Sequence, residues 1–169
     1  METQTLAAHS LLHQTELIFN LNTRLFVNAL VGITEEQALE RISDHNNPVN
    51  WLAAHTVGAR YGVIALLGKP VANPYEGLFE KFKPFDASLD YGSLAKAKAE
   101  WKRVTVLLQS AFSGVTEEYL SAESPLKSPI GDFTNAGTMA FLAHHEAYQI
   151  GQIAFLKKYL TSAAMSYVD

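Results

Sequence analysis

Apolar side chains recur at steps of three and four residues in four long segments of the chain. The segments cover about residues 4–31, 48–67, 94–115 and 135–160, and this spacing places the apolar residues on one face of a helix. Nothing in the sequence has the pattern of a strand. The hydrophobic pattern therefore predicts an all-α fold, a four-helix bundle.

Each segment has a predicted interior stripe. The stripes are Leu11, Ile18, Leu21 and Leu25 in the first segment; Leu52, His55, Ala59, Gly62 and Leu66 in the second; Leu94, Ala97, Trp101, Val104, Leu108, Ala111 and Val115 in the third; and Leu142, His145, Gln149, Gln152, Leu156 and Tyr159 in the fourth. The third stripe is the most regular, and the second and fourth are interrupted by polar side chains.

The links between these segments differ in length. Thr34-Glu35-Glu36-Gln37 predicts a capping box that opens a short helix, and Asn46-Asn47-Pro48 predicts the start of the second long helix, with asparagine as its cap. Residues 68–91 carry prolines, glycines and interspersed aromatic residues, Tyr75, Phe79, Phe82 and Phe85 among them, which predicts a long but packed loop. Because short links favour antiparallel neighbours and a long link permits a crossover, we expect an up-down-down-up bundle in a single domain, residues 1–169.

Net charge and composition exclude several classes of partner and of metal ligand. The net charge of -4 and the isoelectric point near 5.8 argue against nucleic acid and against an acidic membrane surface as partners. Without cysteine, a metal must be held by His, carboxylate, amide or water. We see no signal peptide and no run of about 18 apolar residues, the length of a membrane span, so we expect a cytoplasmic protein.

Polar residues with metal-binding groups interrupt two of the apolar stripes. His145 and Gln149 are four residues apart and share one face of their helix, and His55 lies on the stripe of another helix. Three such side chains could hold one metal ion and leave positions open for water or substrate. The alternative is that they are buried core residues satisfied by hydrogen bonds, because leaving such groups unpaired costs about 1–3 kcal/mol each.

The motifs around these residues resemble those of the DinB/YfiT-like superfamily. The segment from Asn47 to His55 is similar to its W-L-x-x-H motif, and the segment from His145 to Gln152 is similar to H-E-x-Y-H-x-G-Q. The order of the helices and the long middle crossing also fit. The resemblance implies an up-down-down-up bundle, often a homodimer, with a divalent metal bound by three histidines. Carried over, His55 and His145 match the first two ligands, and Gln149 stands at the third.

Gln149 changes what the resemblance implies about the metal. An amide oxygen is a weaker ligand than imidazole for Zn²⁺ or Ni²⁺, so binding of an ion of the Zn, Ni or Mn class is expected to be weakened or lost. The first functional hypothesis is a metal-dependent transferase or hydrolase, in which a low-molecular-weight thiol or water attacks a small electrophile. The second is a metal-free binding or interaction bundle, a homodimer with a degenerate ion site. A bis-histidine haem protein is a third, weaker reading.

Other polar residues are given smaller roles. His144 points about 100° away from His145 and is expected to pack or to lie at a subunit interface. His9 and His13 could donate a substitute ligand, although a solvated position near the helix start is favoured. Glu146 is expected to support the site or to lie on the helix surface. Tyr148 and Gln152 could line a pocket, with Tyr148 as a candidate proton donor, and Trp51 and Trp101 are expected in the core.

Overall fold

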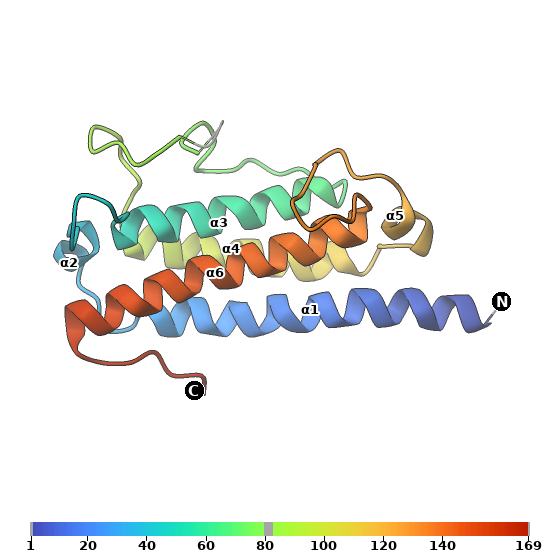
Figure 1. Cartoon of the computed structure of the whole chain (residues 1–169), viewed down its shortest axis with the longest axis horizontal. Coiled ribbons are helices and arrows are strands. Elements are labelled where there is room, and N and C mark those ends of the chain that lie inside the picture. Colours follow the sequence, from blue (N-terminus) through green and yellow to red (C-terminus); the bar gives the residue numbers. More distant parts are fainter. Residues whose placement is uncertain (1, 80–82, 169) are drawn as a thin grey trace.

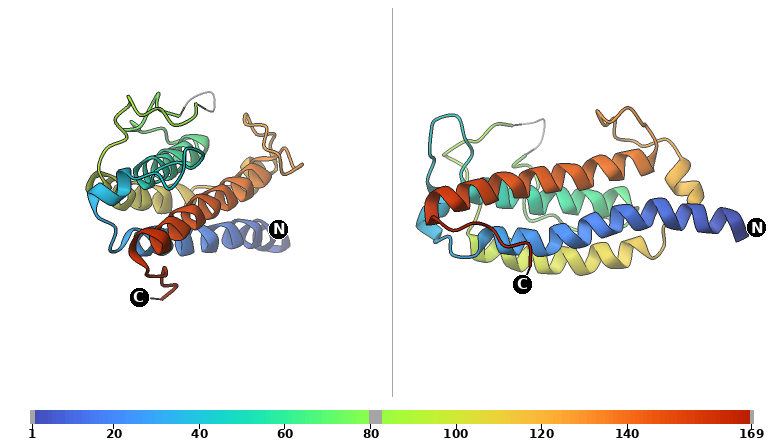
Figure 2. Two further views of the ribbon diagram at one scale, coloured as in Figure 1. Left: turned by 60° about the vertical axis from the view of Figure 1, so that its left-hand side comes forward. Right: turned by 60° about the horizontal axis from the view of Figure 1, so that its bottom comes forward.

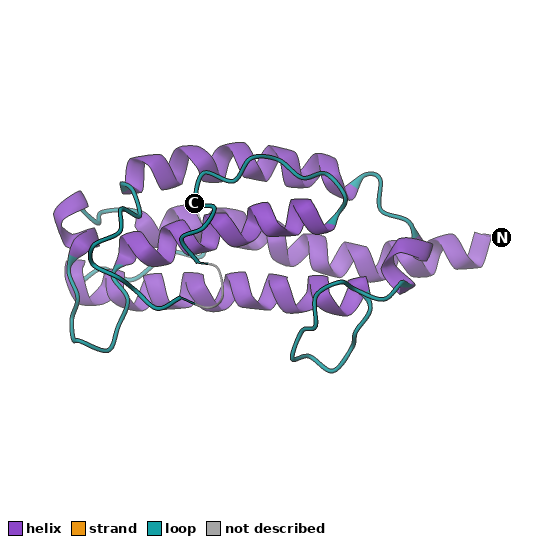
Figure 3. Cartoon of the chain, turned by 90° about the horizontal axis from the view of Figure 1, so that it is seen from above, coloured by secondary structure: helices purple, strands orange, loops and turns teal. Residues whose placement is uncertain are grey.

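The computed structural model describes the backbone of residues 2–79 and 83–168 and the side chains of residues 12–79 and 83–168. This part of the chain is helical, its helices are joined by loops, and it contains no strand (Figures 1 and 3). The all-α class predicted from the sequence is confirmed. The helices are α1 (Glu2–Leu30), α2 (Glu35–Leu39), α3 (Val49–Leu66), α4 (Leu94–Phe112), α5 (Glu117–Ser121) and α6 (Asn135–Thr161).

The four long helices α1, α3, α4 and α6 lie side by side along one axis (Figures 1 and 2). Helices α1 and α6 run in one direction and α3 and α4 run in the other, while the segment after α3 returns along the bundle to the start of α4. Helix α6 packs against α1 and α3, and α3 also packs against α4. The candidate residues of α3 and α6 are therefore on neighbouring antiparallel helices.

Side chains at the start of the short helix α2 cap two helices, α2 itself and α4. The predicted capping box is present: Gln37 N donates to Thr34 Oγ1 (3.1 Å) and Thr34 N donates to Gln37 Oε1 (3.0 Å). The Glu35 carboxylate accepts hydrogen bonds from the backbone N–H groups of Leu94 (2.8 Å) and Ala95 (3.1 Å). A negative charge there stabilises the positive end of the α4 dipole, so α2 anchors α4 after the long crossing.

Helix α4 and the crossing behave as the sequence predicts. The α4 stripe from Leu94 to Ala111 is buried, and only Val115 falls beyond the end of the helix. In the crossing, Tyr75 and Tyr91 are each only 2% exposed. Phe79 and Phe85 pack against the core beside them, which keeps the loop on the bundle, and Phe82 lies outside the described residues.

The predicted stripe of α1 is partly wrong. Ile18 and Leu21 are 43% and 40% exposed, Leu25 is buried as expected, and Leu11 lies outside the described side chains. The buried face runs instead through Leu12, Thr15, Phe19, Asn22, Phe26 and Ala29. Helix α1 carries apolar residues on more than one face, so spacing alone selects the wrong one.

The stripes of α3 and α6 also differ from prediction. Gly62 of α3 is exposed, and α3 is preceded by Pro48 without a side-chain cap rather than by a capping asparagine. In α6, Tyr159 is 65% exposed and Gln152 is only half-buried. Gln149 and Leu156 are buried as predicted, but the buried face also includes Met139, Ala143, Glu146, Ile150 and Ile153. The buried face of α6 is therefore wider than the predicted stripe.

Gly137 allows the loop before α6 to approach the first turn of that helix. A Cβ atom at Gly137 would lie 2.5 Å from Asp132 Cγ and 2.6 Å from its backbone oxygen. At Gly62, in the exposed part of α3, a Cβ atom would meet nothing within 4 Å. The two glycines therefore offer opposite environments for the same added methyl group.

We expect Gly137→Ala to lower the free energy of unfolding by about 1–2 kcal/mol, because the steric clash outweighs the gain in helix propensity. Gly62→Ala, the matched control, is expected to raise it by up to about 1 kcal/mol. Urea unfolding followed by circular dichroism measures both values. Equal stabilisation by the two substitutions would show that the loop does not need the close approach.

Candidate functional site

The structure brings His55, His145 and Gln149, here called the His–Gln cluster, together between α3 and α6. The His55 and His145 rings are 5.2 Å apart between centroids and are nearly perpendicular. Gln149 Nε2 lies 3.5 Å from His145 Nε2, and the Gln149 side chain also influences the pKa of His55. Gln149 is buried and the two histidines are half-buried. Three side chains named from the sequence thus share one location.

The His–Gln cluster contains buried polar atoms without hydrogen-bond partners. Within the described part of the chain, His55 Nδ1, His145 Nδ1 and Gln149 Oε1 have none, and neither has the nearby Trp51 Nε1. Each such atom costs about 1–3 kcal/mol of folding free energy when it stays unpaired. Two imidazole nitrogens and an amide oxygen are also chemical donors that metal ions accept. The donor set therefore fits a bound cation, although one donor is weaker than imidazole.

Both histidines are held in the neutral form. Burial lowers the pKa of His55 to about 4, assisted by His145 and opposed by the neighbouring Gln149 side chain. Burial also lowers the pKa of His145, with a smaller contribution from His144. Because neutral imidazole is the form that binds metal ions, the cluster is ready for metal at neutral pH.

Aromatic rings surround the His–Gln cluster. The His55 ring lies 4.9 Å from the rings of both Trp51 and Phe79, and the His145 ring lies 6.2 Å from Phe141. Phe79 belongs to the long crossing between α3 and α4, so that loop forms one wall of the site. The Phe79 ring in turn packs on Tyr91 at 5.9 Å. These apolar walls reduce access of water and lower the local dielectric, which explains the lowered pKa values.

A buried ion pair lies one residue along α6 from the cluster. Arg60 of α3 is fully buried and binds Glu146 of α6 through two hydrogen bonds, Nη2 to Oε1 (2.6 Å) and Nε to Oε2 (2.8 Å). Of the two expectations for Glu146, a supporting role or a position on the helix surface, the second is wrong, because Glu146 is only 2% exposed and is paired inside the bundle. Burial raises the pKa of Glu146, and the guanidinium opposes that rise.

Arg60 uses all five of its N–H donors. Besides Glu146, Nη1 donates to Thr23 Oγ1 and Thr105 Oγ1 (2.8 Å each), and Nη2 donates to the Phe19 carbonyl (3.1 Å). The sequence held a signal that pattern analysis missed: Arg60 is the only charged residue of α3. A lone charge in an otherwise uncharged buried helix indicates a partner on a neighbour.

Several other candidate residues are exposed or lie outside the described side chains. His144 and His13 are exposed, and the side chain of His9 lies outside the described residues. Tyr148 is 60% exposed. Among described residues, no group of three or more His, Cys, Asp or Glu side chains could hold a metal ion. The third side chain of the cluster is an amide, Gln149.

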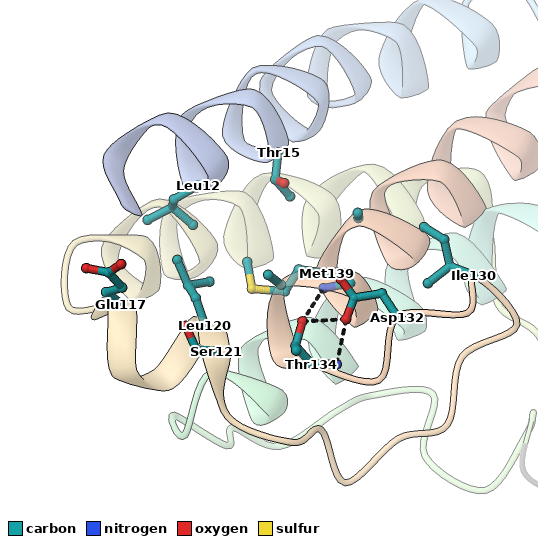
Figure 4. A pocket seen from close by; sticks show the side chains of 12 residues that line it. Leu12, Thr15, Glu117, Leu120, Ser121, Ile130, Asp132, Thr134 and Met139 are labelled. Carbon is teal, nitrogen blue, oxygen red and sulfur yellow. Dashed lines mark hydrogen bonds between the residues drawn. The ribbon is translucent and has the colours of Figure 1, made fainter. Parts of the chain in front are cut away.

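A separate hollow of about 400 Å³ lies at the end of the bundle where α6 begins (Figure 4). Its walls come from α1, α5, α6 and the loop before α6, and they are mainly apolar, with Leu12, Leu120 and Met139 among them. Asp132 Oδ1 accepts from Thr134 N (2.9 Å) and Oγ1 (2.7 Å) at its edge. No histidine is among its described lining residues, so this hollow is distinct from the His–Gln cluster.

The family model of the DinB superfamily matches residues 18–153, well over half of the chain. The chain belongs to the DinB superfamily. A search of curated proteins finds no match. The DinB match includes the Arg60–Glu146 pair and every member of the His–Gln cluster. Among described residues, no helix has the length and hydropathy to span a membrane.

Removing one partner of the buried pair in this DinB protein should be costly. We expect Arg60→Met to lower the free energy of unfolding by about 3–5 kcal/mol, because it leaves the Glu146 carboxylate buried without its cation. Arg103→Met is the matched control, because Arg103 is 56% exposed and lies 3.5 Å from Glu100; we expect it to cost less than about 1 kcal/mol. Denaturant unfolding compares the two.

The double variant Arg60→Met/Glu146→Leu removes both charges of the pair. It should recover part of the loss, because no buried charge is left unpaired. Equal, small effects of Arg60→Met and Arg103→Met would contradict a central role for the pair.

The lowered pKa of His55 predicts a loss of stability in mild acid. The folded value of about 4 lies below the unfolded value of about 6.5, so the unfolded state binds more protons between these values. Stability that is present above pH 6.5 is therefore lost as the pH falls towards 4. We expect the metal-free wild type to lose about 1–2 kcal/mol more than His55→Gln between pH 7 and pH 5.

Urea unfolding of both proteins at the two pH values measures this difference, and the titration of shared carboxylates cancels. Parallel pH profiles for the two proteins would show that His55 is not held neutral by the fold.

Proposed function

We propose that this DinB protein is an up-down-down-up bundle that binds a divalent cation through His55, His145 and Gln149. The proposed activity is that of a metal-dependent hydrolase or transferase acting on a small electrophile with water or a low-molecular-weight thiol. The observation that carries the proposal is the set of unpartnered buried atoms on three side chains that meet between α3 and α6.

The donor set selects the type of ion. Two neutral imidazoles suit ions of the Zn, Ni or Mn class, and the Gln149 amide oxygen lowers the affinity relative to a third imidazole. When bound, such an ion lowers the pKa of a coordinated water or thiol and polarises an electrophile. The affinity of the site is expected to rise with pH, because protons compete for the two imidazoles.

The surrounding residues have separate tasks in this proposal. Trp51 and Phe79 limit access of water to His55, and the Arg60–Glu146 pair fixes α3 against α6. Glu146 cannot serve as a general base, because both of its carboxylate oxygens are bonded to Arg60. Tyr148, adjacent to Gln149 and exposed, is the remaining candidate proton donor on α6.

A metal-free binding bundle is the second candidate. Two observations favour it: Gln149 already contacts both histidines, and no third His, Cys, Asp or Glu joins them among the described side chains. Exposed apolar side chains on the outer faces of α1 and α6, such as Ile18 and Phe155, would then serve a homodimer. The two candidates differ in whether the wild type takes up metal.

We expect elemental analysis of untagged protein, together with titration of Mn²⁺, Ni²⁺ and Zn²⁺, to give about one ion per chain. His145→Ala should abolish this binding. His144→Ala is the matched control, because His144 is the adjacent exposed histidine, and it should bind as the wild type does. Gln149→His should raise the Zn²⁺ affinity by at least about tenfold.

The outcomes separate the two candidates. A wild type that takes up none of these ions, together with a Gln149→His variant that binds Zn²⁺ tightly, would support the metal-free bundle. If neither protein binds, the three positions do not form one metal site.

A further inference from the structure

A second hollow, of about 440 Å³, lies between the segment that leads into α3 and the second half of α6. Ile42 and Leu52 lie on one side of it, and Phe155 and Leu156 lie on the other. Its volume falls within the range of about 300–1,000 Å³ that is typical of small-molecule sites. It is therefore large enough for a ligand with one or two rings.

The hollow adjoins the His–Gln cluster along both helices that form it. Leu52 lies three residues before His55 in α3, and Gln152 lies three residues after Gln149 in α6. Side chains three residues apart are neighbours on a helix surface, with Cβ atoms about 5–6 Å apart. A molecule in this hollow would therefore lie one helical turn from His55 and Gln149.

The side chains that line the hollow indicate whether its ligand is charged. No charged side chain is among the described lining residues, whose polar groups are amides and the Tyr148 phenol. A charged molecule would lose hydration there without gaining a counter-ion, which is costly. An uncharged molecule loses little and gains contact with the apolar walls.

Two of the lining amides are available for a ligand. Asn46 is used within its own loop, where its Oδ1 accepts from Ser43 N (2.7 Å) and its Nδ2 donates to the Asn47 carbonyl (3.0 Å). Within the described part of the chain, the half-buried side chains of Asn47 and Gln152 have no hydrogen-bond partner. An amide both donates and accepts, so it matches a neutral carbonyl or carboxamide.

We infer that this hollow binds the substrate of the proposed function, and that the substrate is an uncharged, largely apolar small molecule with a carbonyl or carboxamide group. This inference rests on the proposed function for the position of the reacting end, which extends towards His55 and Gln149. The apolar body lies against Leu52 and Phe155, and Asn47 and Gln152 bind the polar group.

Gly151 provides a way to fill the hollow without touching the cluster. It lines the hollow, it is exposed, and a Cβ atom there would meet nothing within 4 Å. Gly151→Leu therefore adds a side chain to the empty space, and leucine suits the interior of a helix. Gly62→Leu is the matched control, because Gly62 is equally open but lies on α3 and does not line the hollow.

The probes are 2-naphthamide and two charged molecules of the same shape, 2-naphthoate and 2-naphthylmethylammonium. Ligand-observed NMR should show that the wild type binds 2-naphthamide at least about tenfold more tightly than either charged probe. Gly151→Leu should weaken the binding of 2-naphthamide by about tenfold or more, and Gly62→Leu should leave it unchanged. Equal binding by Gly151→Leu and the wild type, equal binding of the three probes, or no binding of 2-naphthamide at millimolar concentration would overturn the inference.

A parallel measurement separates this inference from the proposed function. Zn²⁺ titration of Gly151→Leu should match the wild type, and 2-naphthamide should still bind to His145→Ala. Metal binding without binding of 2-naphthamide would overturn the pocket and leave the metal proposal intact. Binding of 2-naphthamide that Gly151→Leu blocks, in a wild type that takes up no metal, would support the pocket and count against the metal centre.

Discussion

The Arg60 guanidinium ties together all four long helices. From α3 it binds Glu146 of α6, the Phe19 carbonyl and Thr23 hydroxyl of α1, and the Thr105 hydroxyl of α4. Its Cζ also lies 3.5 Å from the ring centroid of Trp101 in α4, a cation–π contact. Each lost contact would leave part of this buried charge uncompensated. The contacts of this one side chain therefore favour one placement of the four long helices relative to one another.

That constraint reaches the His–Gln cluster through the chain itself. Glu146 directly follows His145, and Arg60 lies five residues after His55, so the pair that locks α3 to α6 also sets how closely the two imidazoles approach. The two polar groups of the core then differ in kind. The Arg60 donors are all used, whereas the cluster retains unpartnered nitrogen and oxygen atoms. The fully hydrogen-bonded Arg60 network contributes to the stability of the bundle. The unpartnered atoms of the neighbouring His–Gln cluster indicate a place for a ligand.

The sequence predicted the helices, the capping box, the packed crossing and the α4 stripe, because each depends on local spacing or a local motif. It failed where two faces of a helix competed: α1 has apolar residues on several sides, so Ile18 and Leu21 appeared to be core although they are exposed. On α6 it named Gln149 and Leu156 correctly as buried but left out neighbouring buried positions such as Glu146, whose buried partner Arg60 lies on another helix. The meeting of His55, His145 and Gln149 was predicted from register and family resemblance together, while the sequence could not give their unpartnered atoms.

Gln149 suits the electrostatics of its position. Two imidazoles 5.2 Å apart against Trp51 and Phe79 are driven to the neutral state, and a third imidazole would add another group to titrate in the same apolar space. An amide carries no charge at any pH and can donate to one histidine while accepting from another. Its contact with His145 is long, 3.5 Å, so a cation or ligand that displaced it would break only a weak hydrogen bond. Burial keeps the two histidines neutral, and Gln149 adds no charge to the cluster while its long contact with His145 is readily broken.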